Sequence, residues 1–186
     1  MMRFFRQYAA AIFLTIFAIT AASAQSQSVQ PLQSVQPTLQ TASIESLIAS
    51  DTLKTALQDI SDALKGTRYR YGGNTVTTGL DCSGLVRLIW KELTPVVTLS
   101  TLALSPLNLP RSAAQMAQVG TAIEIEDLRA GDLVFFNTRG FQFSHVGIYL
   151  GMGKFVHAST MLRRVTENDL SEKYFKTRFN GARRII

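Results

Sequence analysis

The chain has 186 residues, a formal net charge of +6 and 46% hydrophobic residues, which indicates one globular domain with an apolar segment attached. Its single cysteine excludes an internal disulfide, so no covalent cross-link can stabilise the fold. The modest positive charge suits an anionic surface such as a cell wall, and we expect neither a nucleic-acid partner nor a cofactor.

The N-terminal segment has the features of a secretory signal peptide. Arg3 and Arg6 precede an almost wholly apolar run over residues 8–20, and residues 22–24 (Ala-Ser-Ala) match a signal-peptidase site. An uncleaved membrane anchor is the alternative, but a spanning helix needs about 20 apolar residues. We therefore predict a signal peptide over 1–24 and an exported protein of the periplasm or cell envelope. No cysteine follows the cleavage site, so we do not expect a lipoprotein.

A segment rich in Gln, Ser and Thr follows, and its composition predicts a flexible tether over residues 25–50. The pattern then changes, because four apolar residues recur at helical spacing: Leu53, Leu57, Ile60 and Leu64. They predict an amphipathic helix over 51–65 that ends at Gly66. We expect the folded domain to occupy residues 51–186.

Cys82 follows a glycine-rich turn and begins a second predicted helix, for which Asp81 is the expected N-cap. Unpaired N–H groups and the positive end of the helix dipole favour a thiolate at such a position. The pKa of cysteine then falls to between roughly 3.5 and 7.5. The position predicts a nucleophile that attacks a carbonyl. The alternative is a small apolar residue packed under the helix.

An uncharged apolar segment, residues 95–109, separates this helix from the next one. Such a segment is expected to pack on the domain, on a partner protein or on a membrane. A short helix over about 112–118 follows, with Ser112 as its N-cap and Gly120 as its stop.

The C-terminal half contains short β-prone segments bounded by glycine turns. The clearest are residues 132–136, 145–150 and 155–159, and the segments 163–165 and 178–186 are expected to add edge strands. Helices followed by an antiparallel sheet indicate an α+β domain of about 140 residues.

The two histidines lie on adjacent predicted strands joined by a three-residue Gly-Met-Gly loop. This loop pairs Leu150 with Lys154, so the numbers of paired residues sum to 304. Gly147 then lies opposite His157, and His145 is its diagonal neighbour, with Cβ atoms about 7–8 Å apart. Both rings share one face and can form a hydrogen bond over the glycine. A shift of one residue would place them on opposite faces.

These residues fit the roles of a cysteine peptidase: Cys82 as nucleophile, His145 as base and His157 as the group that orients the base. The backbone N–H of Cys82 and the hydroxyl of Tyr69 are the expected oxyanion donors. Two alternatives remain open. The histidines are structural, or they bind zinc together with Cys82, although the usual ligand spacing is absent and we expect no metal.

Six blocks closely resemble, in the same order, the NlpC/P60 family of cell-wall cysteine peptidases. They are residues 69–73, 81–86, 109–112, 130–136, 144–151 and 155–159. The resemblance covers about residues 55–186, and six ordered blocks are far more specific than one. It implies a papain-like fold with N-terminal helices packed on a central antiparallel β-sheet.

The resemblance also implies hydrolysis of peptidoglycan stem peptides, at the γ-D-glutamyl to diamino-acid bond or at the cross-link. It assigns the nucleophile to Cys82, the base to His145 and the third polar residue to His157. The same three residues would also serve an amidase or an acyltransferase. A third alternative is a wall-binding module that retains the fold without turnover.

In relatives, the residues that match Asp81 and Ser83 can contact the free amine of a short stem peptide, and Arg111 lies near the cleft. The resemblance therefore implies that these three residues bind substrate. The apolar stretch 95–109 departs from the family, because it is longer than the usual link there. It is the expected site of any protein or membrane contact, and we otherwise expect a monomer.

Overall fold

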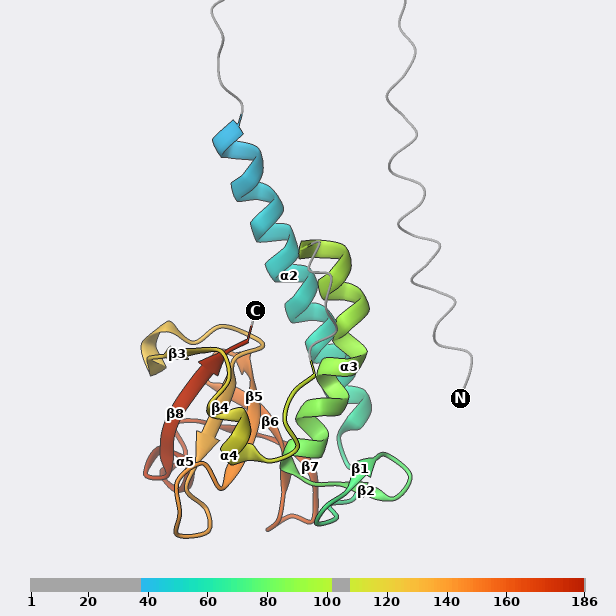
Figure 1. Ribbon diagram of the computed structural model, residues 1–186, viewed down its shortest axis with the longest axis vertical. Helices are drawn as coiled ribbons and strands as arrows, with labels where there is room; N and C mark the ends of the chain where they lie inside the picture. Colours follow the sequence, from blue (N-terminus) through green and yellow to red (C-terminus); the bar gives the residue numbers. More distant parts are fainter. Residues whose placement is uncertain (1–37, 102–107, 186) are drawn as a thin grey trace, which may run out of the picture. The chain divides into compact units, whose positions relative to one another are not determined.

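The computed structural model describes residues 38–101 and 108–185. The predicted signal peptide and residues 25–37 of the predicted tether lie outside the described residues, so both stay predictions. The described chain contains helices followed by a mostly antiparallel sheet, which confirms the α+β expectation (Figure 1).

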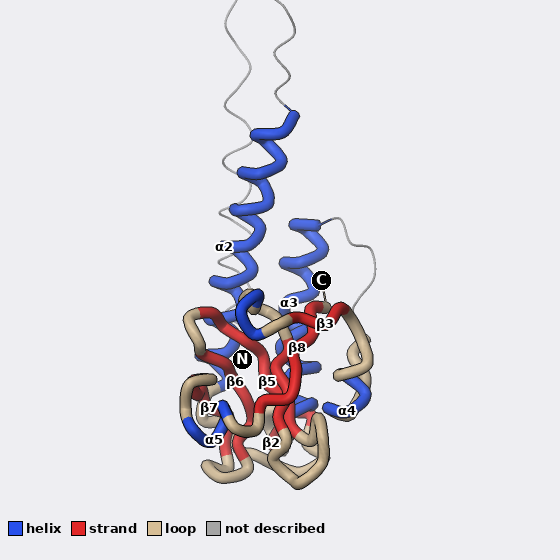
Figure 2. Tube along the Cα trace, turned by 90° about the vertical axis from the view of Figure 1, so that its left-hand side faces the viewer, coloured by secondary structure: helices blue, strands red, loops and turns tan. Residues whose placement is uncertain are grey.

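Six strands form one sheet, drawn in red in Figure 2. Their order is β3-β8-β4-β5-β6-β7, and every neighbouring pair is antiparallel. Their bounds are Thr121–Ile123 for β3, Leu133–Phe136 for β4, His145–Gly151 for β5, Lys154–Ser159 for β6, Arg164–Asp169 for β7 and Phe179–Arg184 for β8. A two-stranded hairpin of β1 (Asn74–Thr75) and β2 (Gly79–Leu80) precedes the sheet in the chain.

The edge-strand prediction is right for β7 and wrong for β8. Strand β7 ends the sheet, whereas β8 lies between β3 and β4. Strand β3 was not predicted, because it has only three residues, and it pairs with the edge of β8 that was expected to be unpaired. Strands β4, β5 and β6 form the middle of the sheet, where the two histidines lie.

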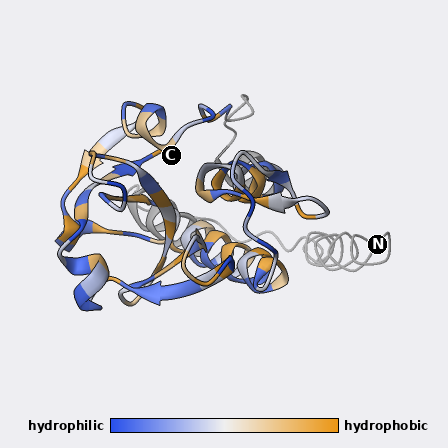
Figure 3. Cartoon of the chain, turned by 90° about the horizontal axis from the view of Figure 1, so that it is seen from below, coloured by the Kyte–Doolittle hydropathy of each residue, from blue (hydrophilic) through white to orange (hydrophobic). Residues whose placement is uncertain are grey.

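Helices α2 (Thr38–Leu64) and α3 (Cys82–Thr101) lie side by side and cover one face of the sheet (Figure 1). Their apolar residues form a core with alternate residues of the strands: Leu57, Leu85, Ile89, Val146, Ile148 and Val156. Figure 3 shows apolar residues on both the helices and the strands. This packing fixes the start of α3, and therefore Cys82, against the sheet.

Two expectations about the helices are wrong. Helix α2 begins at Thr38 rather than at residue 51, so residues 38–50 are helical and not a tether. Once the packed half of a helix has formed, each further residue adds a hydrogen bond without a new nucleation cost, and Ala, Leu, Gln and Glu in this stretch favour the helix.

Helix α3 likewise continues through Pro95 to Thr101, although proline lacks the N–H that a helix interior uses. The apolar segment 95–109 is therefore partly an extension of this helix, and its residues 102–107 lie outside the described chain. None of the described helices is both long and apolar enough to cross a membrane.

The other face of the sheet carries an aromatic core. Phe136 and Phe155 pack there against Phe175 of α5 (Lys173–Lys176), with ring centroids 4.9–5.3 Å apart. The ring of His157 lies 5.3 Å from Phe175 in the same layer. Two short segments complete the chain: helix α4 (Ala113–Met116) and the 3-10 helix Ile125–Asp127.

Candidate active site

Cys82 is the first residue of α3, and Asp81 is its N-cap as predicted. The Oδ1 atom of Asp81 accepts a hydrogen bond from the backbone N–H of Gly84 at 2.6 Å. A Cβ atom on Gly84 would lie 2.1 Å from the carbonyl oxygen of Gly73, so the glycine-rich turn rests directly on the helix start. The local sequence therefore holds Cys82 at a fixed position beside this turn.

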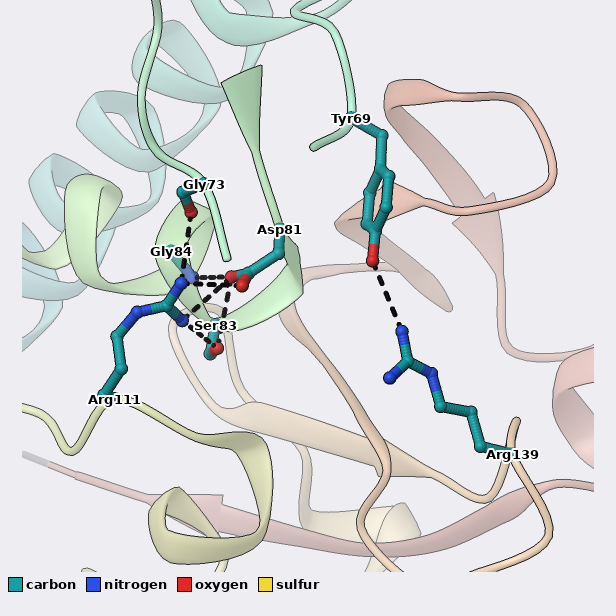
Figure 4. Close-up of polar contacts among 7 residues, drawn as sticks. All are labelled: Tyr69, Gly73, Asp81, Ser83, Gly84, Arg111 and Arg139. Carbon is teal, nitrogen blue, oxygen red and sulfur yellow. Dashed lines mark hydrogen bonds and ion pairs between the residues drawn. The ribbon is translucent and has the colours of Figure 1, made fainter. Parts of the chain in front are cut away.

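Asp81, Ser83 and Arg111 form one polar cluster (Figure 4). The guanidinium of Arg111 donates from Nη1 to Asp81 Oδ1 at 3.0 Å and from Nη2 to Asp81 Oδ2 at 2.7 Å. Nη1 also donates to the Ser83 hydroxyl at 2.8 Å. The Asp81 side chain holds the pKa of Arg111 above its usual value. Arg111 therefore lies in the expected place, and it already neutralises the carboxylate that was expected to bind a substrate amine.

The sulfur of Cys82 contacts the sheet at the start of β5. Burial raises the pKa of the thiol above its ordinary value, and the backbone N–H groups of Val146 and Ser83, which face the sulfur, offset only part of that rise. The expected low pKa of Cys82 is therefore wrong, because the helix start is also packed against the sheet. At neutral pH the resting residue is a thiol.

The hairpin of β5 and β6 has the predicted register over most of its length. Ile148 pairs with Val156 and Tyr149 with Phe155, so the numbers sum to 304 as expected. The expected Leu150–Lys154 pair is wrong: Lys154 pairs with Gly151, and a bulge accommodates the extra residue.

The two histidines share one face of the sheet, as predicted. His145 Nε2 lies 2.8 Å from His157 Nδ1, and the ring planes are perpendicular, at 90°. Gly147 makes this approach possible, because a Cβ atom there would lie 3.3 Å from His157 Cβ and 2.8 Å from the Val156 carbonyl oxygen. Both histidines are buried, at 6% and 3% exposure.

Two residues that the sequence did not reveal continue this chain of hydrogen bonds. His157 Nε2 lies 2.8 Å from Asn168 Oδ1. The Nδ2 atom of Asn168 donates to both carboxylate oxygens of Glu172, at 2.9 and 3.0 Å. A carboxylate only accepts hydrogen bonds, so Glu172 fixes which end of the Asn168 amide faces His157.

This order sets the tautomers of both rings. Because Asn168 presents its carbonyl oxygen, His157 donates from Nε2 and its Nδ1 is an acceptor. His145 then donates from Nε2, which leaves its Nδ1 unprotonated and able to accept a proton. Burial, together with smaller effects of His157 and Arg139, lowers the pKa of His145 to about 3. Burial also lowers the pKa of His157, so both rings are neutral at pH 7.

Within the described chain, no side-chain hydrogen bond joins Cys82 to His145. The sulfur instead contacts the N–H of Val146, the next residue along β5. Hydrogen bonds between catalytic groups are often long without substrate and tighten in the complex. The structure therefore joins the two histidines directly and places Cys82 beside their strand.

A cleft of about 480 Å³ opens above Cys82. Its lining includes Tyr69, the predicted oxyanion donor, and Arg139, which the sequence analysis did not select. Arg139 Nη2 donates to the Tyr69 hydroxyl at 3.4 Å (Figure 4). Burial raises the pKa of Tyr69, so its hydroxyl keeps its proton at neutral pH. Among the described residues, no three His, Cys, Asp or Glu side chains form a group that could bind a metal ion.

Comparisons with known proteins agree with this fold. A sequence model described as the NlpC/P60 family matches residues 66–184. The murein DD-endopeptidase MepS/murein LD-carboxypeptidase of Escherichia coli is 38% identical over 142 residues, which are 76% of this chain and 68% of that protein. The gamma-DL-glutamyl hydrolase of Bacillus subtilis is 36% identical over 140 residues, which are 74% of this chain but 31% of that protein.

A solved structure of an NlpC/P60 family protein from Bacillus cereus is also similar. Its TM-score is 0.60 at 26% sequence identity, and the match covers 71% of this chain and 40% of that one. This chain therefore spans less than half of the Bacillus cereus protein and of the Bacillus subtilis hydrolase.

Proposed function

We propose, since this chain belongs to the NlpC/P60 family, that it is a peptidoglycan hydrolase that cleaves stem peptides as a cysteine endopeptidase. One observation carries the proposal. An unbroken chain of hydrogen bonds runs from Glu172 through Asn168 and His157 to His145. It leaves Nδ1 of His145 unprotonated and able to act as a base, and the next residue, Val146, contacts the sulfur of Cys82 through its N–H. The names of the relatives support a bond in a murein stem peptide, either a γ-glutamyl bond or the cross-link.

The reaction begins from a neutral thiol and a neutral imidazole. As the sulfur attacks the scissile carbonyl, His145 Nδ1 takes the thiol proton, so the thiolate forms only during attack. The new imidazolium keeps its hydrogen bond from Nε2 to His157 Nδ1, and the charge of Glu172 raises the proton affinity of the His157 ring. Asn168 keeps both rings oriented through these steps.

The oxyanion that forms on the carbonyl needs donors. The backbone N–H of Cys82 at the start of α3 is one, and the Tyr69 hydroxyl in the same cleft is the other. His145 then returns its proton to the leaving amine, and an acyl-enzyme thioester remains. A water molecule, deprotonated by His145, hydrolyses this thioester and restores the thiol.

The test uses purified peptidoglycan and defined muropeptides, with products identified by mass spectrometry. Wild-type protein should release products cut at one peptide bond, and Cys82→Ala should release none while its circular dichroism and melting curve stay unchanged. Digestion by Cys82→Ala at the wild-type rate would contradict the nucleophile assignment. Transfer of the acyl group to an added amine, in place of water, would instead identify an acyltransferase.

The predicted signal peptide supports an exported enzyme that acts in the periplasm or cell envelope. A fusion of residues 1–50 to a reporter that is active only after export tests this placement. Reporter activity that persists when residues 8–20 are deleted would contradict it.

A further inference from the structure

Arg139 lies in the loop between β4 and β5, and it lines the same cleft as Cys82. Its side chain is exposed, and its guanidinium carbon lies 5.3 Å from the centre of the Tyr71 ring. Nη2 contacts the Tyr69 hydroxyl at 3.4 Å, across the cleft from the cluster around Arg111 (Figure 4). Within the described residues, no carboxylate pairs with Arg139.

The charges of the cleft do not balance. Its lining carries one carboxylate, Asp81, and two guanidinium groups, those of Arg111 and Arg139, which gives a net charge of +1. Arg111 and Asp81 neutralise each other through two hydrogen bonds. The surplus positive charge is therefore that of Arg139, a planar group whose geometry matches a carboxylate.

The same cleft offers little to a free amine. Asp81 is 7% exposed, and its two oxygens already accept from Arg111, Ser83 and the N–H of Gly84. An ammonium group would have to compete with a bidentate guanidinium at short distance. Its binding at Asp81 would also bring a second cation beside Arg111.

We propose that Arg139 binds a carboxylate of the substrate next to the scissile amide, and that cleavage requires this carboxylate but not a free N-terminal amine. This inference rests on the proposed function and names its substrate class: anionic peptides, with the amino terminus blocked or free. It departs from the amine contact that the family resemblance implied for Asp81 and Ser83.

The carboxylate can come from either side of the scissile bond. A γ-linked glutamyl residue leaves its α-carboxylate free on the acyl side, and the residue that leaves with the amine carries a carboxylate of its own. Three matched γ-D-glutamyl peptides separate these sources: one with both carboxylates free, one amidated on the acyl side and one amidated on the leaving side. A fourth peptide has both carboxylates free and an acetylated N-terminus.

The measurement is kcat/KM on each peptide for wild type, Arg139→Gln and Arg139→Lys. A charge-assisted contact predicts that one of the two amidations lowers the wild-type value about 10- to 100-fold. Arg139→Gln should cleave that amidated peptide and the peptide with both carboxylates free with kcat/KM values within about threefold of each other. Arg139→Lys should restore part of the preference for the free carboxylate. Because the readout is a ratio between substrates, a general loss of stability or turnover does not change it.

The matched control is Arg129→Gln, since Arg129 is an exposed arginine outside the cleft lining, and it should keep the wild-type ratio. Acetylation of the N-terminus should leave kcat/KM unchanged. The inference is overturned if acetylation abolishes cleavage, if neither amidation slows wild type, or if Arg139→Gln keeps the full preference. In those three cases the protein is still a hydrolase. Failure of wild type to cleave any of the four peptides overturns the inference, and it overturns the proposed function as well only if purified peptidoglycan is also left uncut.

Discussion

Under the proposed mechanism, Asn168 decides which nitrogen of His145 acts as the base, so Asn168→Ala should slow catalysis although Asn168 lies outside the cleft lining. The substitution removes the acceptor for His157 Nε2, whose ring is 3% exposed. A buried donor without a partner costs about 1–3 kcal/mol. The pair of rings can avoid this cost by moving its protons, so that His157 donates from Nδ1 to His145 Nε2.

The exchanged arrangement is unproductive, because His145 then carries its proton on Nδ1 and cannot accept one from Cys82. Loss of 1–3 kcal/mol of preference for the productive arrangement predicts a fall in kcat of about 5- to 150-fold. KM should not change, since neither Asn168 nor His157 lines the cleft. Glu172→Ala should have a smaller effect in the same direction, because the freed amide of Asn168 can turn its Nδ2 toward His157.

The assay combines steady-state kinetics with nitrogen NMR of histidine-labelled Cys82→Ala protein, in which the shifts distinguish protonated from unprotonated ring nitrogens. The matched control is Thr166→Ala. Thr166 lies on the same strand and pairs with His157 in register, but its hydroxyl donates to the Glu167 carbonyl. It should change kcat by no more than about twofold. An Asn168→Ala protein with wild-type kcat, or with unchanged ring shifts, would refute the tautomer argument.

Three further predictions address the oxyanion donor, the hairpin and acid stability. Tyr69→Phe should lower kcat about 10²- to 10³-fold without loss of fold, and an unchanged kcat would remove Tyr69 from the oxyanion site. Gly147→Ala should lower the free energy of unfolding in urea by about 1–3 kcal/mol, because its Cβ would meet the Val156 carbonyl at 2.8 Å; equal stability would contradict the close approach. Burial lowers the pKa values of His145 and His157 below the ordinary 6.5, so the unfolded chain takes up protons first, and the free energy of unfolding should fall as pH falls from about 6.5 toward 3. Urea titrations at pH 7, 6 and 5 should show a loss of up to about 1.4 kcal/mol per pH unit for each histidine, with a smaller slope in His157→Asn and no slope if the rings are charged when folded.

The parts of the site that the sequence predicted depend on local geometry. Asp81 and Cys82 share one turn of backbone, so the cap and the position of the nucleophile follow from their order in the chain. The histidine pair follows from a short loop and the alternation of side chains along two strands. The bulge at Gly151 changes the pairing only beyond Tyr149, and therefore leaves the two rings on the same face.

The parts that the sequence missed depend on contacts between distant segments. Asn168 could have been found by the rule that located His145, because β6 and β7 pair residues whose numbers sum to 323 and Asn168 lies opposite Phe155. The predicted strand over 163–165 ended before this position. The predicted pKa of Cys82 was wrong for a related reason. The effect of a helix start on the pKa depends on local sequence, whereas the burial of Cys82 depends on which distant segment packs over it.

Strand β5 sets the geometry between Cys82 and His145 through its two faces. The side chain of Val146 packs in the core beneath α3, its N–H contacts the sulfur of Cys82, and the adjacent His145 points to the aromatic side of the sheet. The distance between sulfur and imidazole is therefore fixed by how tightly α3 packs on β5, since no side-chain hydrogen bond joins the two groups within the described chain. It follows that the core to which Leu85 and Val146 both belong helps to set the distance between Cys82 and His145, and that loosening this core should change the reactivity of the thiol before it changes the fold.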